Sequence, residues 1–158
     1  MDVLSAFTAL EQGPIGTFVK DKGATFATIE AVHLLALAVL GGAVFASDLR
    51  LMNVILRDVP SKIVTDGAHR WFKWALVVSL ITGFFMLSGI AVKCYHNTYF
   101  WVKMTALATG ILFAFLIRKP LLAGDHAQLK PITLKLVGLA SISVWFIVAA
   151  SGRWIGFS

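Results

Sequence analysis

Two residues that can do chemistry stand three positions apart in the apolar stretch IEAVHLLALAVL, residues 29–40. They are Glu30 and His33, and they share one face of a helix because residues three apart are neighbours on its surface. A neutral imidazole is a common ligand of metals and of haem iron, and a nearby carboxylate can accept a hydrogen bond from it or pair with a cation. The pair therefore raises two hypotheses, a metal-binding site and a purely structural polar cluster.

The composition indicates that these residues lie inside a membrane. Hydrophobic residues make up 58% of the 158-residue chain and charged residues only 14%, far from the balance of soluble domains. Four apolar segments are long enough to cross a bilayer core of about 30 Å as helices: residues 24–47, 71–92, 99–117 and 132–151. We predict an all-α fold, a four-helix transmembrane bundle that forms a single integral membrane domain over residues 1–158.

The first sixteen residues, MDVLSAFTALEQGPIG, are too short and too polar to cross the bilayer. Gly13 and Pro14 are typical of a helix end. One helical face carries the apolar residues Val3, Leu4, Phe7 and Leu10, a pattern typical of helices that lie flat in the membrane interface. We therefore expect a short N-terminal interfacial helix.

Other classes of protein are excluded or disfavoured by composition. A single cysteine, Cys94, cannot form an internal disulfide, and the chain has no CxxCH motif for covalently attached c-type haem. The net charge of +6 would favour nucleic acid as the partner of a soluble protein. Here the basic residues stand mainly where apolar segments end, as they do beside lipid headgroups, so we expect membrane lipid and no nucleic acid.

The basic residues also predict the orientation of the chain. An even number of spans places both termini on one face, which carries Lys20, Lys22, Lys93 and Arg153, with Lys103 a little inside. The opposite face carries Arg50, Arg57, Lys62, Arg70, Lys73, Arg118, Lys119, Lys130 and Lys135. Because cytoplasmic loops are enriched in Lys and Arg, we predict a multi-pass protein of the bacterial inner membrane with both termini in the periplasm.

Depth in the bilayer decides which side chains can meet. Counted from the middle of each segment, His33 and Lys103 lie at similar levels, within about 10 Å of the midplane, and Met86 and Trp145 fall in the same layer. Glu30 lies one turn above His33. We expect His96 at the outer surface, and His69 and His126 at the inner surface or its loops, where an interfacial role is the simplest interpretation. A zinc or copper site built from His69 and His126 would lack the usual ligand spacings.

Ionisable groups at this depth are costly unless they are paired, so they should face the bundle. One interpretation is structural: Glu30 pairs with Lys103, and His33 donates to a carbonyl group. The other is that His33 is an axial ligand of a b-type haem held among the four helices. The sixth iron position would then belong to Lys103, to Met86, to His96 if the second helix continues past Tyr95, or to no residue. Arg153 would bind either a haem propionate or a lipid phosphate.

Several segments, in this order and spacing, resemble a bacterial four-helix membrane family of unassigned function. They are IEAVHLLALAVLGG, ASDLRLM, LITG (residues 80–83), YHNTYFWVK (95–103) and SISVWFIVAASGRWIGF (141–157). The chain is more distantly similar to the copper-resistance protein D family and to HemJ-type protoporphyrinogen oxidases. These families pair a first-helix histidine with a lysine of a later helix and bind haem b, so the resemblance implicates His33 and Lys103, and not His69, His96 or His126.

We expect a membrane b-type haem protein that acts in electron transfer with a quinone or a periplasmic redox protein. We also expect it to self-associate through faces of small residues. Two alternatives stay open. One is a HemJ-like tetrapyrrole oxidoreductase in which Lys103 acts as an acid or base. The other is a non-redox copper or solute transport protein in which Glu30, His33 and Lys103 line a polar path.

Overall fold

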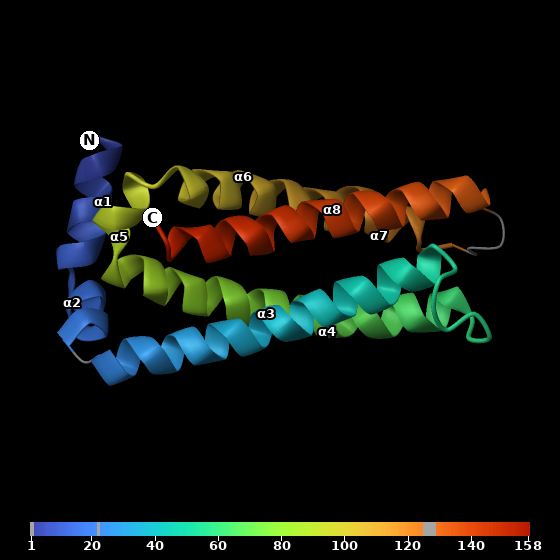
Figure 1. Cartoon of the computed structure of the whole chain (residues 1–158), viewed down its shortest axis with the longest axis horizontal. Coiled ribbons are helices and arrows are strands. Elements are labelled where there is room, and N and C mark those ends of the chain that lie inside the picture. Colours follow the sequence, from blue (N-terminus) through green and yellow to red (C-terminus); the bar gives the residue numbers. More distant parts are fainter. Residues whose placement is uncertain (1, 22, 125–128) are drawn as a thin grey trace.

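Four long helices dominate the computed structural model, which describes residues 2–21, 23–124 and 129–158 (Figure 1). They confirm the predicted all-α transmembrane bundle, because all four are long and apolar enough to cross a membrane. The first, second and fourth are α3 (Gly23–Leu51), α4 (Ser61–Gly89) and α8 (Pro131–Ile155). The third is continuous from α6 (Thr98–Leu112) through the π-helix η1 (Phe113–Arg118) to α7 (Lys119–Leu121).

The N-terminal segment forms two short helices rather than one, α1 (Val3–Gln12) and α2 (Pro14–Asp21). The break falls at Gly13, as the sequence predicts, because Pro14 has the fixed φ that suits the first position of a new helix. Both helices lie across the end of the bundle where the two termini are found (Figure 1). A carboxylate oxygen of Glu11 accepts a hydrogen bond from the backbone N–H of Val92 at 2.6 Å, and Glu11 also pairs with Lys20.

The second spanning helix differs from the predicted segment at both ends. It begins at Ser61, ten residues before residue 71, and its first turns carry the charged residues Lys62, Asp66 and Arg70. At its other end α4 stops at Gly89, and Ile90 leaves the helical conformation with φ −139° and ψ 34°. A Cβ on Gly89 would lie 2.9 Å from a methyl carbon of Val19 on α2. The close packing of α2 therefore requires glycine here, and the chain continues as the short helix α5 (Ala91–Tyr95).

The bundle consists of two helix pairs, α3 with α4 and α6 with α8, which are joined chiefly by α3 and α8. At the α3–α8 contact, a Cβ on Gly138 would lie 3.0 Å from the carbonyl oxygen of Asp48, so glycine permits the close approach. The core contains buried residues of every spanning helix: Leu40, Val44, Phe72, Ala75, Leu76, Ala114, Trp145 and Val148.

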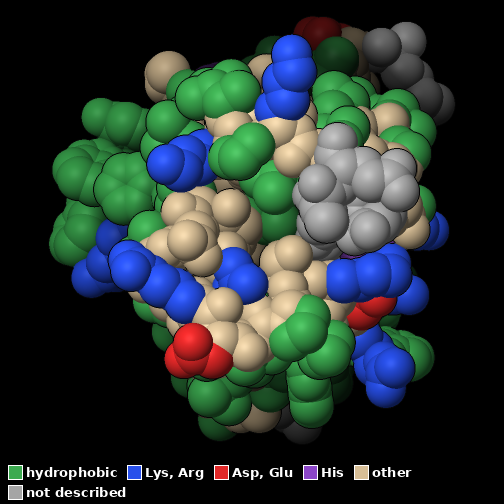
Figure 2. All heavy atoms as spheres, turned by 90° about the vertical axis from the view of Figure 1, so that its right-hand side faces the viewer, with side chains coloured by type: hydrophobic (Ala, Val, Ile, Leu, Met, Phe, Trp, Pro, Cys, Tyr) green, Lys and Arg blue, Asp and Glu red, His purple; other side chains and the backbone are tan. Residues whose placement is uncertain are grey.

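The end of the bundle opposite the termini is rich in lysine and arginine (Figure 2). We call it the inner end and the end with both termini the outer end. Exposed cations of the inner end are Arg57, Lys62, Arg70, Lys73, Lys119, Lys130 and Lys135. The orientation of the bundle in a membrane stays a prediction from this charge distribution.

Candidate functional site

His33 is buried on α3 and faces α4, with 7% of its surface exposed. Its Nδ1 lies 2.8 Å from the hydroxyl oxygen of Thr82. The next residue on α4 is Gly83, where an added Cβ would lie 3.3 Å from Cε1 of the imidazole. The small residue thus lets the ring lie against the α4 backbone while Thr82 holds its orientation.

The hydrogen bonds of Thr82 indicate which ring nitrogen of His33 carries the proton. The Thr82 hydroxyl donates to the carbonyl oxygen of Val78 at 2.7 Å, so its own hydrogen is already used. With that hydrogen on Val78, the hydroxyl oxygen accepts from Nδ1–H of His33, because a hydroxyl has one hydrogen and two lone pairs, and this arrangement favours the Nδ1–H tautomer. In this tautomer Nε2 carries the lone pair of the ring, as in histidines that bind metals through that nitrogen, and the imidazole also hydrogen-bonds the backbone of Ser79.

Lys103 lies on α6 within electrostatic range of both His33 and Cys94. Its side chain lies over Gly152 of α8, where an added Cβ would be 3.2 Å from Nζ. Within residues 2–21, 23–124 and 129–158, its ammonium group has no hydrogen-bond or ion-pair partner. The structure therefore brings His33 and Lys103 into one region, as the depth argument predicts, and leaves the lysine charge unpaired.

Glu30 does not join this region. It is exposed on the surface of α3, and it makes neither of its expected contacts, the hydrogen bond to His33 or the ion pair with Lys103, in the part of the chain that the structure describes. The expected ion pair of Glu30 with Lys103 is therefore wrong, whereas His33 hydrogen-bonds the backbone of Ser79 on α4, as the structural interpretation expected, in addition to the Thr82 hydroxyl.

The other residues predicted to lie at or near the haem make no hydrogen bond to His33 in the described part of the chain. His96 is exposed beyond the end of α5, with its ring against Tyr95 at 5.0 Å, and the condition that the second helix continues past Tyr95 is not met. Arg153 is exposed at the outer end, with its guanidinium 4.3 Å from the centre of the Phe157 ring. Trp145 packs against Phe72 at 5.1 Å in the core. Met86 is partly buried on α4.

Cys94 is buried in α5, outside the spanning helices. Burial raises the pKa of its thiol, and the nearby charges of Lys103 and Lys93 oppose this effect less strongly. The thiol is therefore protonated at neutral pH and a poor nucleophile, since the thiolate is the reactive form.

A second polar cluster lies at the inner end, and sequence reasoning did not find it. Arg118 donates to a carboxylate oxygen of Asp48 at 2.7 Å and also to the hydroxyl of Ser47. The ion pair is buried, with 0% of the Asp48 side chain and 12% of the Arg118 side chain exposed. Arg118 ends the π-helix η1, a rare conformation that often marks functional positions in α-helices. Asp48, near the end of α3, therefore pairs with a residue of a neighbouring spanning helix.

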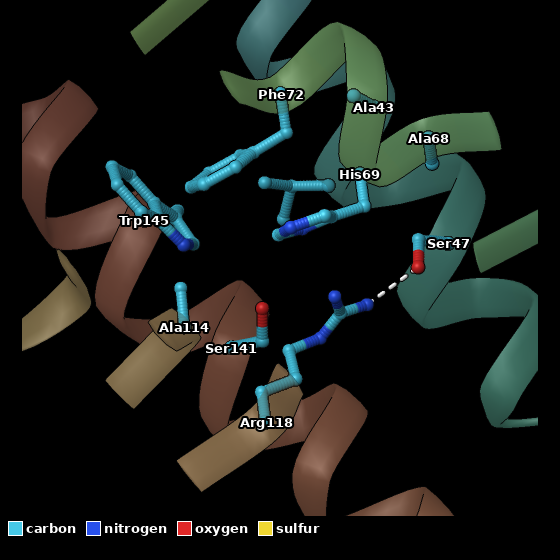
Figure 3. A pocket seen from close by; sticks show the side chains of 10 residues that line it. Ala43, Ser47, Ala68, His69, Phe72, Ala114, Arg118, Ser141 and Trp145 are labelled. Carbon is cyan, nitrogen blue, oxygen red and sulfur yellow. Dashed lines mark hydrogen bonds between the residues drawn. The ribbon is translucent and has the colours of Figure 1, made fainter. Parts of the chain in front are cut away.

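This cluster borders a small cavity of about 20 Å³ that also contains the side chain of His69 (Figure 3). Three buried polar atoms here have no hydrogen-bond partner among the described residues: Nε2 of His69, Nε of Arg118 and one carboxylate oxygen of Asp48. Phe72 and Trp145 form apolar walls, and Ser141 of α8 lies near Asp48. The sequence suggested an interfacial role for His69. The structure instead turns its ring inward, against Phe72 and Phe115.

The sequence does contain one indication of the Asp48–Arg118 ion pair, namely two opposite charges at similar depth. Asp48 ends the first span and Arg118 ends the third, so both lie near the inner surface. Their contact could be proposed from this, but the rotation of each helix decides whether they meet. His126, the other inner histidine, lies outside the described residues. Elsewhere in the described chain, no three His, Cys, Asp or Glu side chains gather closely enough to hold a metal ion.

The fold and the two polar clusters define a multi-pass helical membrane protein with ionisable groups inside its bundle. The sequence profile of a family of unknown function, DUF6644, matches residues 6–158. The chain belongs to this family, which agrees with the membrane family of unassigned function that its motifs resemble. No curated protein and no solved structure matches the chain.

Proposed function

We propose that the chain binds a b-type haem through His33 and transfers electrons in the membrane. The observation that carries this proposal is the hydrogen bond between Nδ1 of His33 and the Thr82 hydroxyl, which in the Nδ1–H tautomer would put the lone pair for iron on Nε2. Axial histidines usually donate their other N–H to a neighbouring group, which fixes the ring and its tautomer. The haem would supply reversible one-electron chemistry.

Two unpartnered polar groups near His33 support the proposal. Ser79, on α4 one turn before Thr82, has a buried hydroxyl without a partner in the described structure. The unpaired ammonium of Lys103 lies in the same region, and an unpaired charge within a membrane is expensive. Lys103 would either occupy the sixth iron position or balance the charge of the bound group. Arg153 at the outer end is available to a propionate, whose carboxylate matches its guanidinium.

The proposal includes a location and partners. The cation-rich inner end supports an orientation with that end in the cytoplasm and both termini in the periplasm of a bacterial inner membrane. Electrons would be exchanged with a quinone or with a periplasmic redox protein. The presence of His33 and Lys103 in one region supports a distant relationship to copper-resistance protein D and to HemJ-type oxidases. The histidine and lysine of those families motivate the choice of haem b.

Absorption spectroscopy tests the proposal. The purified full-length chain, expressed with 5-aminolevulinic acid, should show a Soret band that His33→Ala removes and that His69→Ala and His96→Ala retain. Thr82→Val should keep the band but weaken haem binding by about tenfold or more, because it removes the group that orients the ligand. Thr82→Ser, which keeps the hydroxyl, should restore the affinity.

Lys103→Met separates electron transfer from the enzymatic alternative. A haem carrier should keep its pigment with an altered spectrum, whereas a HemJ-like enzyme would lose oxidation of protoporphyrinogen with its pigment intact. A colourless preparation after haem-supplemented expression would overturn the proposal and favour the transport alternative. A Soret band that persists in His33→Ala would overturn the assignment of the ligand.

A further inference from the structure

Two cavities adjoin one another on the inner side of His33, and their lining residues on α3 lie roughly 10 to 20 Å along the helix from it. The first is the polar cavity that contains His69 and Arg118 (Figure 3). The second is a groove of about 280 Å³ between α3 and α4, where Val39 and Trp71 are exposed on the outside of the bundle. Ala43 and Ala68 line both cavities, so these two small side chains form the boundary between them.

The two cavities suit opposite ends of one molecule. The groove has apolar walls, Val39, Ala43, Ala46, Val64, Ala68 and Trp71, and opens to the region that lipid tails occupy in a membrane. It therefore suits a hydrocarbon chain or a ring. The polar cavity, at about 20 Å³, has room for one water molecule or for a single oxygen atom of a larger ligand.

The unpartnered atoms in the polar cavity select the chemistry of that oxygen. Nε of Arg118 is a donor, and Nε2 of His69 donates or accepts according to its tautomer. The charge of Arg118 is already balanced by the buried carboxylate of Asp48. A carboxylate ligand would add an uncompensated negative charge beside Asp48, whereas a neutral carbonyl or hydroxyl oxygen would satisfy the free groups.

The geometry points to this double cavity as a binding site for a lipid-soluble quinone. The ring and chain lie in the groove, and one carbonyl oxygen passes Ala43 and Ala68 to accept from His69 and Arg118. In the quinol form, the hydroxyl group donates to the imidazole instead. This site would bind the quinone that the proposed function names as a redox partner. Its redox role rests on that function, but quinone binding itself does not require haem.

Tryptophan fluorescence measures this binding directly, because Trp71 lines the groove and Trp145 lines the polar cavity. Decylubiquinone, added to the full-length protein in phosphatidylcholine nanodiscs, should quench the emission in a saturable manner. Ala68→Leu should abolish the saturable part because it fills the boundary between the cavities. His69→Leu should weaken binding about fivefold, the equivalent of one net hydrogen bond.

Two matched controls accompany these variants. Ala108→Leu adds the same side chain at an exposed position of α6, and His96→Leu removes an exposed histidine at the outer end; both should bind as the unchanged protein does. A thermal unfolding curve for each variant confirms that it is folded. If Ala68→Leu does not fold, the His69→Leu and His96→Leu pair decides.

Non-saturable quenching, or saturable quenching that His69→Leu and Ala68→Leu leave unchanged, would overturn the site. Equal displacement by decanoate would also overturn it, since the site would then select a carboxylate. The Soret test of His33 is independent of all these outcomes. Quinone binding to a protein without haem would refute the proposed function and support the quinone site. Haem binding without saturable quenching would support the proposed function and refute the quinone site.

Discussion

At the scale of single residues, the two clusters solve the problem of a charge inside lipid in different ways. Asp48 and Arg118 neutralise each other in a buried ion pair at the inner end. His33 has only neutral partners, the Thr82 hydroxyl and the Ser79 backbone, and Lys103 has no partner in the described structure. In the first arrangement both charges are satisfied within the bundle. In the second, Lys103 is still available to a bound group, and the haem proposal is based on this second cluster.

Removing one member of the buried ion pair should destabilise the protein strongly. Asp48→Asn leaves the charge of Arg118 buried without a counter-ion, and we expect a loss of about 3 kcal/mol or more in the free energy of unfolding. The double variant Asp48→Asn, Arg118→Gln should recover part of this loss because no single charge remains. Equilibrium unfolding in mixed micelles, followed by tryptophan fluorescence, measures both.

The exposed pair of Lys62 and Asp66, 3.6 Å apart on α4, provides the control. Lys62→Gln should cost less than about 1 kcal/mol, since solvent screens such pairs. Equal losses for Asp48→Asn and Lys62→Gln would contradict a special role for the buried pair.

At the scale of helices, α1 and α2 are attached to the outer end through Glu11. This carboxylate pairs with Lys20 of α2 and accepts from the Val92 backbone at the start of α5. It therefore connects three short helices that would be marginal by themselves. Aromatic contacts of Phe7 with Tyr95 and Phe100, at 5.5 Å and 6.1 Å, add to the attachment.

The attachment of these helices should weaken in acid. The hydrogen bond and charge of Lys20 hold the pKa of Glu11 below its ordinary value of 4.5. A carboxylate whose pKa is lower in the folded state stabilises the fold above its unfolded pKa, and this contribution is lost as the pH falls through the folded value. We expect faster hydrogen exchange in α1 and α2 below about pH 4.5, after correction for the intrinsic exchange rate.

Glu11→Gln should exchange faster already at pH 7 and respond less to acid. Asp21→Asn, at an exposed carboxylate at the end of α2, is the matched control and should keep the acid response. An acid response that Glu11→Gln retains would show that another group controls the attachment.

At the scale of the whole molecule, the ends of the bundle differ in charge, and this difference gives a testable orientation. Cysteine introduced as Asp58→Cys, in the loop between α3 and α4, should react with a membrane-impermeant maleimide only in inverted vesicles. Thr17→Cys, on exposed α2, should react in intact spheroplasts. Cys94 is replaced by alanine in both variants, although its burial already makes it a slow reactant. The opposite labelling pattern would reverse the predicted topology.

Self-association stays a prediction of the sequence. An added Cβ on Gly41 or Gly42 of α3 would meet nothing within 4 Å, so this small-residue face is open within one chain. Such a face allows close helix contact in membranes.

Local sequence is enough to predict a membrane environment for the long helices, the number of spans, the N-terminal helix break at Gly13 and the similar levels of His33 and Lys103 along the bundle. These properties follow from local composition and from a rise of 1.5 Å per residue, so they do not depend on how the helices pack. The sequence did not determine that Thr82, and not Glu30, contacts His33, or that His69 faces a cavity beside Arg118. These contacts appear only in the folded bundle, because they depend on how far each helix is rotated about its axis. That rotation is set by close packing between residues far apart in the chain, such as Gly138 and Asp48.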